Sequence, residues 1–592
     1  MNTRAALPEV PLATKPGLGR TLRGSSLWLC VPAALFIVLV YVVPLAVLLV
    51  RSFTDPTVGL QNYGAVFDNF GYVRTILRTI GISAMATALS LLLGYPLAHV
   101  MVTAGPGWRK FLMLCVITPY VTSVLVRSFA WQVILGRQGL VNKLTEVLGL
   151  GTHDLLFSPF AVAVGMTHYM LPLMILPLTS VMRQVPANLV PAAQSLGAGP
   201  ATAFIRIYLP QTKPGIEAGV VLCFVYGVGA FVIPAILGGN SGAMLGVTIQ
   251  AAIAQRADYG FAAAAATLLA LCVLGVVALY KWRFGGSLET LAAPRNTAQS
   301  GAAVPGRTSA GVLTRMLAVL VRPLDTSGIS RAGWLLKAYS LMVGLLLLLP
   351  QFIAIPVSLS SSRAMVVPPP GWSLQWYRNL ADAAWSEPIV TSLQVAAVVA
   401  VLATTLGTLA ALGVVRSGLS RLGGLTNTLM LIPLLFPTVV AAAAMFVAFL
   451  PLYLTDSRIG LILAHTALAI PFAFIVVLAS ARKLDPKLEQ AAASLGARPW
   501  KRLTRVLVPL LRPSIVVALF LAFITSFDET SMAIFLSGVR VSTLPVQMYD
   551  SLTIQSDPTI AAAAVVIMAL AGAGVGLAPL LAALGSRKGR KK

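Results

Sequence analysis

Charged residues are scarce in this sequence, since Asp, Glu, Lys and Arg together make up 10% of its 592 residues. Soluble domains average about 25% charged residues, so the composition excludes an ordinary soluble protein. Hydrophobic residues account for 57% of the chain. Uncharged runs such as 27–50 and 79–108 are long enough to cross a bilayer, which takes about 20 apolar residues. The sequence therefore predicts an all-α polytopic membrane protein.

Acidic residues are scarcer still, at 18 against 43 Lys and Arg, which gives a net charge of +25. Such an excess is also found in nucleic-acid-binding proteins. Here, however, most basic residues fall on one side of the membrane when the N-terminus is placed inside. This positive-inside bias predicts a membrane protein with both termini cytoplasmic and no nucleic-acid partner. The basic C-terminal tail, 586–592, is expected to contact anionic lipid headgroups.

Cysteine and histidine are also rare, with four of each, and neither shows metal-ligand spacing. The cysteines lie within apolar runs, where thiols pack as small hydrophobic groups. No G-x4-GK[ST] loop is present, so the chain is not expected to cradle ATP phosphates itself. The sequence predicts no metal and no cofactor bound by this chain. The residues concerned are Cys30, Cys115, Cys223, Cys272, His99, His153, His168 and His465.

The apolar runs divide the chain into two halves of six predicted spans each. The first half, 27–284, follows a cytoplasmic tail, 1–26, and a linker, 285–333, leads to the second half, 334–585. Within the linker, 312–322 is predicted as either a surface helix or an entry to the seventh span. An even number of spans gives both halves the same orientation, so they are predicted to be parallel repeats. The predicted spans are 27–50, 79–103, 111–135, 158–182, 214–237, 262–282, 335–358, 389–415, 425–452, 459–481, 513–537 and 560–584.

The two halves repeat each other in sequence as well as in span number. At an offset of 299 residues, Pro172 matches Pro471 and Asp258 matches Asp557. After the first span of each half, Leu-Gln-Asn-Tyr at 60–63 is echoed by Leu-Gln-Trp-Tyr at 374–377, and Pro119 is matched with Pro437. This register indicates a duplicated architecture.

The strongest repeat is a cytoplasmic loop after the fourth span of each half, here called loop 1 (184–213) and loop 2 (483–512). PAAQSLGAGPATAFIRIYLP at 191–210 shares its layout with QAAASLGARPWKRLTRVLVP at 490–509. The Ala-rich start favours a helix, and the Gly permits a sharp turn. The closing Pro stops the second segment. Each loop is therefore predicted to form two short helices that project from the membrane and contact another protein.

These loops resemble the EAA-x3-G-x9-I-x-L-P loop of ABC-importer permeases of the MetI-like class. The sequence departs from this pattern at the first position, where Pro191 and Gln490 replace Glu, and loop 2 has Val for Ile and for Leu. The resemblance implies that both loops couple the chain to an ATPase. The implied coupling residues are Ala192, Ala193, Gly197, Ile207, Leu209 and Pro210 in loop 1, and Ala491, Ala492, Gly496, Val506, Val508 and Pro509 in loop 2.

The resemblance covers nearly the whole chain and extends to a transport system. Residues 118–142 and 231–239 resemble the first membrane subunit of spermidine/putrescine-type importers, and 523–538 and 543–549 resemble the second. The chain is thus similar to a fused permease pair of MetI-like fold, which implies a location in the bacterial inner membrane. This implies two copies of a cytoplasmic ABC ATPase, which would bind the ATP and Mg, and a periplasmic or lipid-anchored substrate-binding protein. Iron(III), thiamine, opine or aminoethylphosphonate are alternative cargoes, and an ion-coupled secondary transporter is a remote alternative.

Ionisable residues inside predicted spans are candidates for the substrate pathway, because charge is costly there. Asp528 and Glu529 fall in the eleventh span, where the matching positions of the first half are Gly229 and Ala230. Two carboxylates would attract a cation, and Tyr226 and Phe231 would add cation–π contacts. The alternative is that the carboxylates cap a broken helix or pair with an Arg.

Two further charges lie in predicted spans. Glu217 is expected in the first turn of the fifth span, where a carboxylate meets the helix dipole favourably. Arg127 interrupts the third span, and snorkelling to the outer interface is its default interpretation, with pairing to an acid as the alternative.

Overall fold

The computed structural model describes residues 27–284, 333–417, 421–555, 557–570 and 572. The predicted tails 1–26 and 586–592, and the linker apart from Gly333, lie outside the described residues, as does 312–322. Within the described part of the chain the fold is all-helical, and its only β-type pairing is one isolated bridge between Ser360 and Trp372. The predicted all-α class is confirmed.

The helices of the first half follow the predicted spans closely at the first, second, fourth and sixth positions. The first span runs from Val31 to Thr54 as α2, a π-helical turn and α3. The second is longer than predicted because it begins at Phe70. In order, the helices are α2 (Val31–Ile37), α3 (Val43–Thr54), α4 (Gln61–Phe67), α5 (Phe70–Thr103), α6 (Pro106–Val121), α7 (Val124–Leu135), α8 (Leu140–Val147), α9 (Pro159–Met182), α10 (Leu189–Ser195), α11 (Pro200–Ala203), α12 (Leu209–Val228), α13 (Val232–Leu237), α14 (Gly239–Gly242), α15 (Leu245–Ala254) and α16 (Tyr259–Phe284).

The second half repeats this order with fewer short helices. Its helices are α19 (Gly333–Ser358), α20 (Gln375–Asn379), α21 (Ala383–Ser417), α22 (Arg421–Leu435), α23 (Thr438–Phe449), α24 (Arg458–Ala481), α25 (Pro486–Ser494), α26 (Pro499–Arg502), α27 (Val508–Phe527), α28 (Ser531–Leu536) and α29 (Leu544–Asp550). A last apolar helix is described over Thr559–Leu570, and the rest of the predicted span 560–584 lies outside the described residues, apart from residue 572.

Each half is built around three mutually packed helices, α5, α9 and α12 in the first and α21, α24 and α27 in the second. Small residues let these helices approach closely, as is common in membrane bundles. A Cβ added to Gly407 of α21 would lie 2.9 Å from the backbone nitrogen of Phe474 on α24, and one added to Gly219 of α12 would lie 2.5 Å from the Met174 sulfur on α9. The matching triads confirm the two parallel repeats.

The first helix of each half packs against the other half. Helices α2 and α3 lie along α21, α22 and α23, whereas α19 lies along α5, α6 and α7. Hydrogen bonds mark both contacts: the Tyr41 hydroxyl donates to the Pro433 carbonyl at 3.4 Å, and the Tyr339 hydroxyl donates to the Leu92 carbonyl at 3.3 Å. The consecutive halves expected from sequence are therefore interlocked in space.

The predicted third and ninth spans are broken helices rather than single spans. Helices α6 and α7 meet at 96°, and α22 and α23 meet at 99°. The first residue after each bend is an N-cap with extended backbone, Ser123 (φ −48°, ψ 140°) before α7 and Pro437 (φ −54°, ψ 134°) before α23. We call Thr122–Ser123 break 1 and Phe436–Pro437 break 2. Because Pro119 and Pro433 both lie four residues before these caps, Pro119 corresponds to Pro433, and its predicted match with Pro437 is wrong.

The predicted fifth and eleventh spans end earlier than expected. Helix α12 stops at Val228 and α27 at Phe527, and the short helices α13 and α28 follow after a turn. Helix α12 carries two charged residues, Lys213 and Glu217, but it packs against α5 and α9 as α27 packs against α21 and α24. Since α12 begins at Leu209, Glu217 is not in its first turn. It lies 3.6 Å from Lys213 as an i,i+4 ion pair, so the helix-dipole interpretation is wrong.

The sequence echo after each first span forms the same local structure in both halves. The Tyr63 hydroxyl lies 2.8 Å from the Ser52 hydroxyl, and the Tyr377 hydroxyl lies 2.8 Å from the Ser358 hydroxyl. Each contact ties a short helix, α4 or α20, to the end of the preceding span. The echo therefore corresponds to a repeated structural element.

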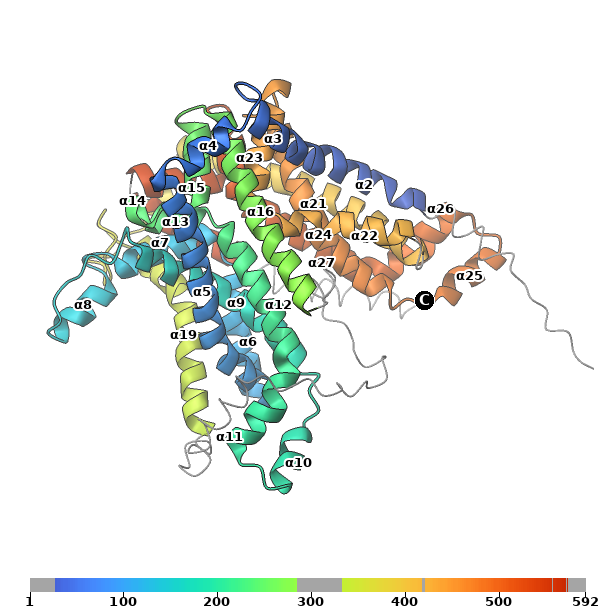
Figure 1. Cartoon of the computed structure of the whole chain (residues 1–592), viewed down its shortest axis with the longest axis horizontal. Coiled ribbons are helices and arrows are strands. Elements are labelled where there is room, and N and C mark those ends of the chain that lie inside the picture. The colour runs from blue at the N-terminus through green and yellow to red at the C-terminus, as the bar shows by residue number, and fades with distance from the viewer. Residues whose placement is uncertain (1–26, 285–332, 418–420, 556, 571, 573–592) are drawn as a thin grey trace, which may run out of the picture.

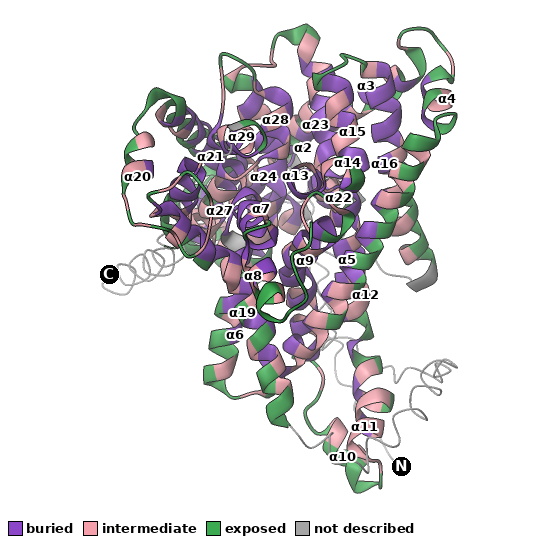
Figure 2. Ribbon diagram, turned by 90° about the vertical axis from the view of Figure 1, so that its left-hand side faces the viewer, coloured by how far each residue is buried: buried purple, intermediate pink, exposed green. Residues whose placement is uncertain are grey.

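The two bundles meet at one end and diverge toward the other, where α10–α11 and α25–α26 project separately (Figure 1). Buried residues are concentrated around α9, α13, α24 and α28, where the halves meet (Figure 2). This arrangement places a shared interface at one end of the molecule and the two loops at the other.

Candidate functional site: a shared cavity and two projecting loops

A cavity of about 310 Å³ lies between the two halves. Helices α7, α9, α12 and α13 of the first half line it, together with α22, α23, α24, α27 and α28 of the second. All four residues predicted for the substrate pathway line this cavity, namely Asp528, Glu529, Tyr226 and Phe231. Whether they contact a substrate stays a prediction.

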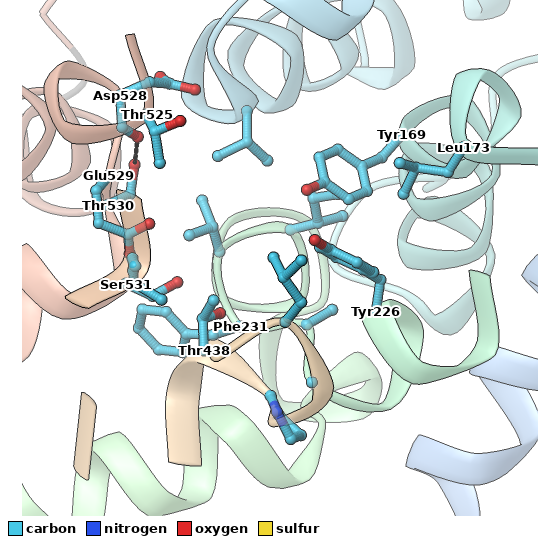
Figure 3. Close-up of a pocket in the computed structure, with 18 of the residues that line it drawn as sticks. Tyr169, Leu173, Tyr226, Phe231, Thr438, Thr525, Asp528, Glu529, Thr530 and Ser531 are labelled. Carbon is cyan, nitrogen blue, oxygen red and sulfur yellow. Dashed lines mark hydrogen bonds between the residues drawn. The ribbon is translucent and has the colours of Figure 1, made fainter. Parts of the chain in front are cut away.

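The two carboxylates lie at the turn between α27 and α28, rather than inside a continuous span as predicted. Asp528 is the C-cap of α27, and Glu529 follows it on the same wall of the cavity (Figure 3). The Thr530 hydroxyl donates to the Asp528 carbonyl at 3.2 Å and stabilises this turn. The sequence missed the turn because apolar residues continue on both sides of it.

The two carboxylates have different partners. Glu529 Oε1 accepts a hydrogen bond from the backbone N–H of Met532 at 2.9 Å, so it caps the start of α28. The Asp528 carboxylate is instead close to the side chain of Ser123 and within electrostatic reach of Arg127, both from the first half. Asp528 therefore joins the second half to break 1.

Aromatic side chains form the opposite wall. The hydroxyl groups of Tyr169 and Tyr226 lie near one another across the cavity from the carboxylates (Figure 3). Phe231 is only 2% exposed, and its ring centroid lies 6.0 Å from those of both Phe535 and Tyr549. Phe231 thus packs across the interface, whereas the two tyrosines present polar groups to the cavity.

Arg127 lines the cavity and does not snorkel, which corrects its default interpretation. The side chain is 6% exposed, and its guanidinium carbon lies 4.7 Å from the centroid of the Tyr169 ring. A buried guanidinium over an aromatic face is a favourable arrangement. The sequence marks Arg127 as unusual because it is a single charge in an apolar run. The direction of its side chain depends on the bend at break 1, which the sequence did not predict.

The interface repeats one contact in two chemical versions. A Cβ added to Gly229, the C-cap of α12, would lie 2.6 Å from the Cβ of Pro437 at break 2. Asp528, the C-cap of α27, contacts Ser123 at break 1 in the corresponding way. The C-terminal end of α12 thus packs against the broken helix of the second half, and that of α27 packs against the broken helix of the first. Gly229 is required by this close approach.

The two loops have the same backbone course, as predicted. In each, a helix ends at a glycine with positive φ, Gly197 at +89° and Gly496 at +77°. The amide of Ala198 donates to the Ala193 carbonyl at 3.1 Å, and that of Ala497 to the Ala492 carbonyl at 3.0 Å, which closes both turns alike. A π-helical segment, Phe204–Tyr208 or Leu503–Leu507, then connects to α12 or α27.

An exposed leucine at each tip was missed by the sequence reasoning. Leu196 is 89% exposed and Leu495 is 88% exposed, each directly before the turn glycine. The shared Ser-Leu-Gly-Ala at 195–198 and 494–497 was the available signal. The two loops thus present the same apolar side chain at the same place.

The predicted coupling residues fall into two groups. Ala192 and Ala491 are exposed on α10 and α25, with Ala193 and Ala492 half-buried beside them. Ile207, Leu209, Val506, Val508 and Pro509 are half-buried and Pro210 is exposed, where the π-helical segments enter α12 and α27. The first group faces outward with the leucines, and the second links the loops to the bundles.

The loops are anchored by different chemistry. In loop 2, Glu489 accepts two hydrogen bonds from Arg416 at the end of α21, at 2.6 and 3.1 Å, and lies 3.8 Å from Arg502. In loop 1, His99 of α5 packs edge-on against Phe204 and Tyr208, with centroids 5.4 and 5.0 Å away. Loop 2 is thus held to its bundle by ion pairs, and loop 1 by aromatic packing.

Comparison with known proteins identifies the class. Residues 90–283 and 403–581 both match the family described as binding-protein-dependent transport system inner membrane component. These two matches cover more than half of the chain, which therefore belongs to this family, as a MetI-like ABC-importer permease with both halves in one polypeptide.

Several curated permease proteins are similar to this chain. The permease PotB of the spermidine/putrescine transport system is 32% identical to this chain over 236 residues, in both Escherichia coli (strain K12) and Salmonella typhi. The match covers 39% of this chain. It covers 84% of the Escherichia coli protein and 81% of the Salmonella typhi protein. PotI of the putrescine transport system of Escherichia coli (strain K12) is 31% identical over 230 residues, 38% of this chain and 82% of PotI. One such permease thus corresponds in size to about one half of this chain.

Among solved structures, the chain is similar to a bacterial alginate ABC transporter in complex with an alginate pentasaccharide-bound periplasmic protein. The identity is 19%, the match covers 45% of this chain and 96% of that chain, and the TM-score is 0.40. The family match and the apolar helices together define a multi-pass inner-membrane permease.

The close approach at break 2 gives the first prediction. We expect Gly229→Ala to lower the thermal unfolding midpoint of the purified protein in detergent, because the new Cβ would meet Pro437, and overpacking costs about 1–3 kcal/mol. Gly275→Ala on α16 is the matched control, since a Cβ there meets nothing within 4 Å. Equal midpoints for the two variants would show that this contact does not hold the halves together.

The second prediction concerns the anchor of loop 2. We expect Arg416→Gln to increase amide hydrogen exchange in 486–496 by about fivefold, since the loss of charged hydrogen bonds costs about 1 kcal/mol in a half-buried setting. Exchange in loop 1 should stay constant, and Arg482→Gln, at an exposed arginine before loop 2, is the control. Unchanged exchange in loop 2 would mean that Glu489 does not anchor it.

Proposed function

We propose that this chain is the membrane-spanning permease of an ATP-driven, binding-protein-dependent importer for spermidine, putrescine or a similar small cation. The observation that carries this proposal is the pairing of one cavity, shared by both halves, with two matched loops that project from those halves. The similarity to PotB and PotI supports the choice of cargo.

The loops are the proposed docking sites for two copies of a cytoplasmic ABC ATPase. Leu196 and Leu495 present isolated apolar side chains at corresponding tips, and buried apolar anchors contribute most of the energy of an interface. The alanines beside them leave room for a partner to approach. ATP and Mg would bind to the ATPase, and the permease would contribute no catalytic residue.

The route from loop to cavity is short and helical. Loop 1 continues through Phe204–Tyr208 into α12, which carries Tyr226, and loop 2 continues through Leu503–Leu507 into α27, which ends at Asp528. A 20-residue helix spans about 30 Å and moves largely as a unit. Closure of the ATPase dimer would therefore move both walls of the cavity, which is the alternating-access step.

The cavity suits a small cation. Its wall of Asp528 and Glu529 faces two tyrosines (Figure 3), and carboxylates with aromatic faces bind ammonium groups. Its volume of about 310 Å³ is at the small end of ligand pockets. The asymmetry of the carboxylates, present in one half only, would orient an elongated cation.

The proposed orientation places both loops in the cytoplasm, in keeping with the positive-inside bias of the sequence. A substrate-binding protein would then dock on the opposite face, near α4, α15 and α20, and deliver cargo to the interface. The family description itself supports dependence on a binding protein.

The test is reconstitution of the chain with its ATPase and binding protein in liposomes, with ATP-dependent uptake of labelled spermidine as the readout. We expect Leu196→Gln combined with Leu495→Gln to reduce uptake at least tenfold and to lose the ATPase on purification, because each buried leucine contributes roughly 1.5–3 kcal/mol. Membrane insertion should stay normal.

The control is Leu144→Gln on α8, which removes a leucine that is also exposed but lies away from both loops. It should leave uptake and ATPase binding unchanged. Normal uptake by the double loop variant would refute the coupling role, and the absence of spermidine uptake by the unaltered protein would refute the proposed cargo.

A further inference from the structure

We propose that Arg127 is a resident cation of the cavity, which competes with the imported cation for Asp528 and the Tyr169 ring and so sets how tightly cargo is held. This inference rests on the proposed function. Arg127 would be a specificity-determining residue of the first half that acts on a carboxylate of the second.

Arg127 already occupies the aromatic face that an ammonium group would use, and it lies near the carboxylate. Its guanidinium lies over the Tyr169 ring at 4.7 Å, and it is within electrostatic reach of Asp528. The Arg127 Nε donates to the carbonyl of Ser123 at 3.4 Å, and the Ser123 side chain contacts the Asp528 carboxylate. An aromatic face and a carboxylate are the two common partners of a protein-bound ammonium.

The charges that line the cavity are few enough to count. Among its described lining residues, Arg127, Asp528 and Glu529 are the only Arg, Lys, Asp or Glu side chains. Glu529 is committed to the Met532 amide at the start of α28, so Asp528 is the carboxylate left to recognise cargo. A cargo cation and Arg127 would then repel each other at this carboxylate.

The position of Arg127 on a broken helix makes the competition switchable. Arg127 lies on the first turn of α7, just after break 1, where α6 and α7 meet at 96°. A short rotation of α7 about Ser123 would withdraw the guanidinium from Asp528 and admit cargo, and its return would expel cargo. An ionisable group kept inside a span is expected to serve such a role.

The experiment measures spermidine binding to the purified permease–ATPase complex without binding protein, and maximal ATP-driven uptake in liposomes with binding protein. We expect Arg127→Gln to tighten spermidine binding about tenfold and to lower maximal uptake about tenfold, because removal of a nearby like charge favours the bound cation and slows its release. Arg127→Lys should stay within about twofold of the unaltered protein.

Four further variants make the result specific. Arg127→Met keeps the packing of the aliphatic part of the side chain and should have the same effect as Arg127→Gln. A difference between these two variants would indicate a folding defect in one of them. Arg137→Gln removes an exposed arginine beyond the end of α7 and should have no effect. Asp528→Asn should weaken spermidine binding. Arg127→Gln should tighten spermidine binding far less in the Asp528→Asn background than in the otherwise unaltered protein, because the arginine acts through this carboxylate.

The outcomes separate the two proposals. If the unaltered protein takes up spermidine but Arg127→Gln and Arg127→Met bind it equally or more weakly, Arg127 helps to hold the structure or the cargo, and the competition is refuted. If the unaltered protein neither binds nor takes up spermidine, the proposed cargo is wrong and this inference falls with it.

Discussion

The structure depends on one contact made twice: the end of a core helix packs into the broken helix of the other half. Gly229 meets Pro437 at one copy, and Asp528 meets Ser123 at the other. Both helix ends and both breaks lie on the wall of the same cavity or next to it. Because the contact joins the halves where the cavity lies, any movement between the halves must change the cavity. The first copy is a tight apolar fit that only glycine permits, and the second is polar, so the two sides of the cavity differ in chemistry although the backbone repeats.

The exchange of first helices complements this contact. Helices α2 and α3 pack on the second half, and α19 packs on the first, so part of each half's core is covered by a helix of the other half. The loops lie at the far ends of α12 and α27, where the bundles diverge (Figure 1). A force applied at the loops therefore acts on the same two helices that end at the cavity. Separate anchors, ionic at Glu489 and aromatic at His99, hold the loops to these bundles.

The sequence alone predicts the class of fold because hydrophobic runs and charge bias directly reflect the membrane. It also places the turn in each loop, since a glycine with positive φ leaves a recognisable pattern around Gly197 and Gly496. The four substrate-pathway candidates share one cavity, and the two carboxylates could be found from the sequence because charge is costly inside a span. The two breaks and the helix exchange were missed for a physical reason. Side chains that face lipid and those that face another helix are equally apolar, so hydropathy specifies a span but not its partner. Arg127 shows the consequence, since its role depends on the bend at Ser123.

The most direct test of the account is whether both loops move when the ATPase binds ATP. Spin labels attached at Ser195→Cys and Ser494→Cys would report the distance between the loops by pulsed electron paramagnetic resonance spectroscopy. These are two exposed and equivalent positions beside the tip leucines. Cys272, which is only partly buried, would first be replaced by Ser. In the reconstituted complex the account predicts a shorter distance with a non-hydrolysable ATP analogue than without nucleotide. An unchanged distance, in a complex that still transports cargo, would contradict it.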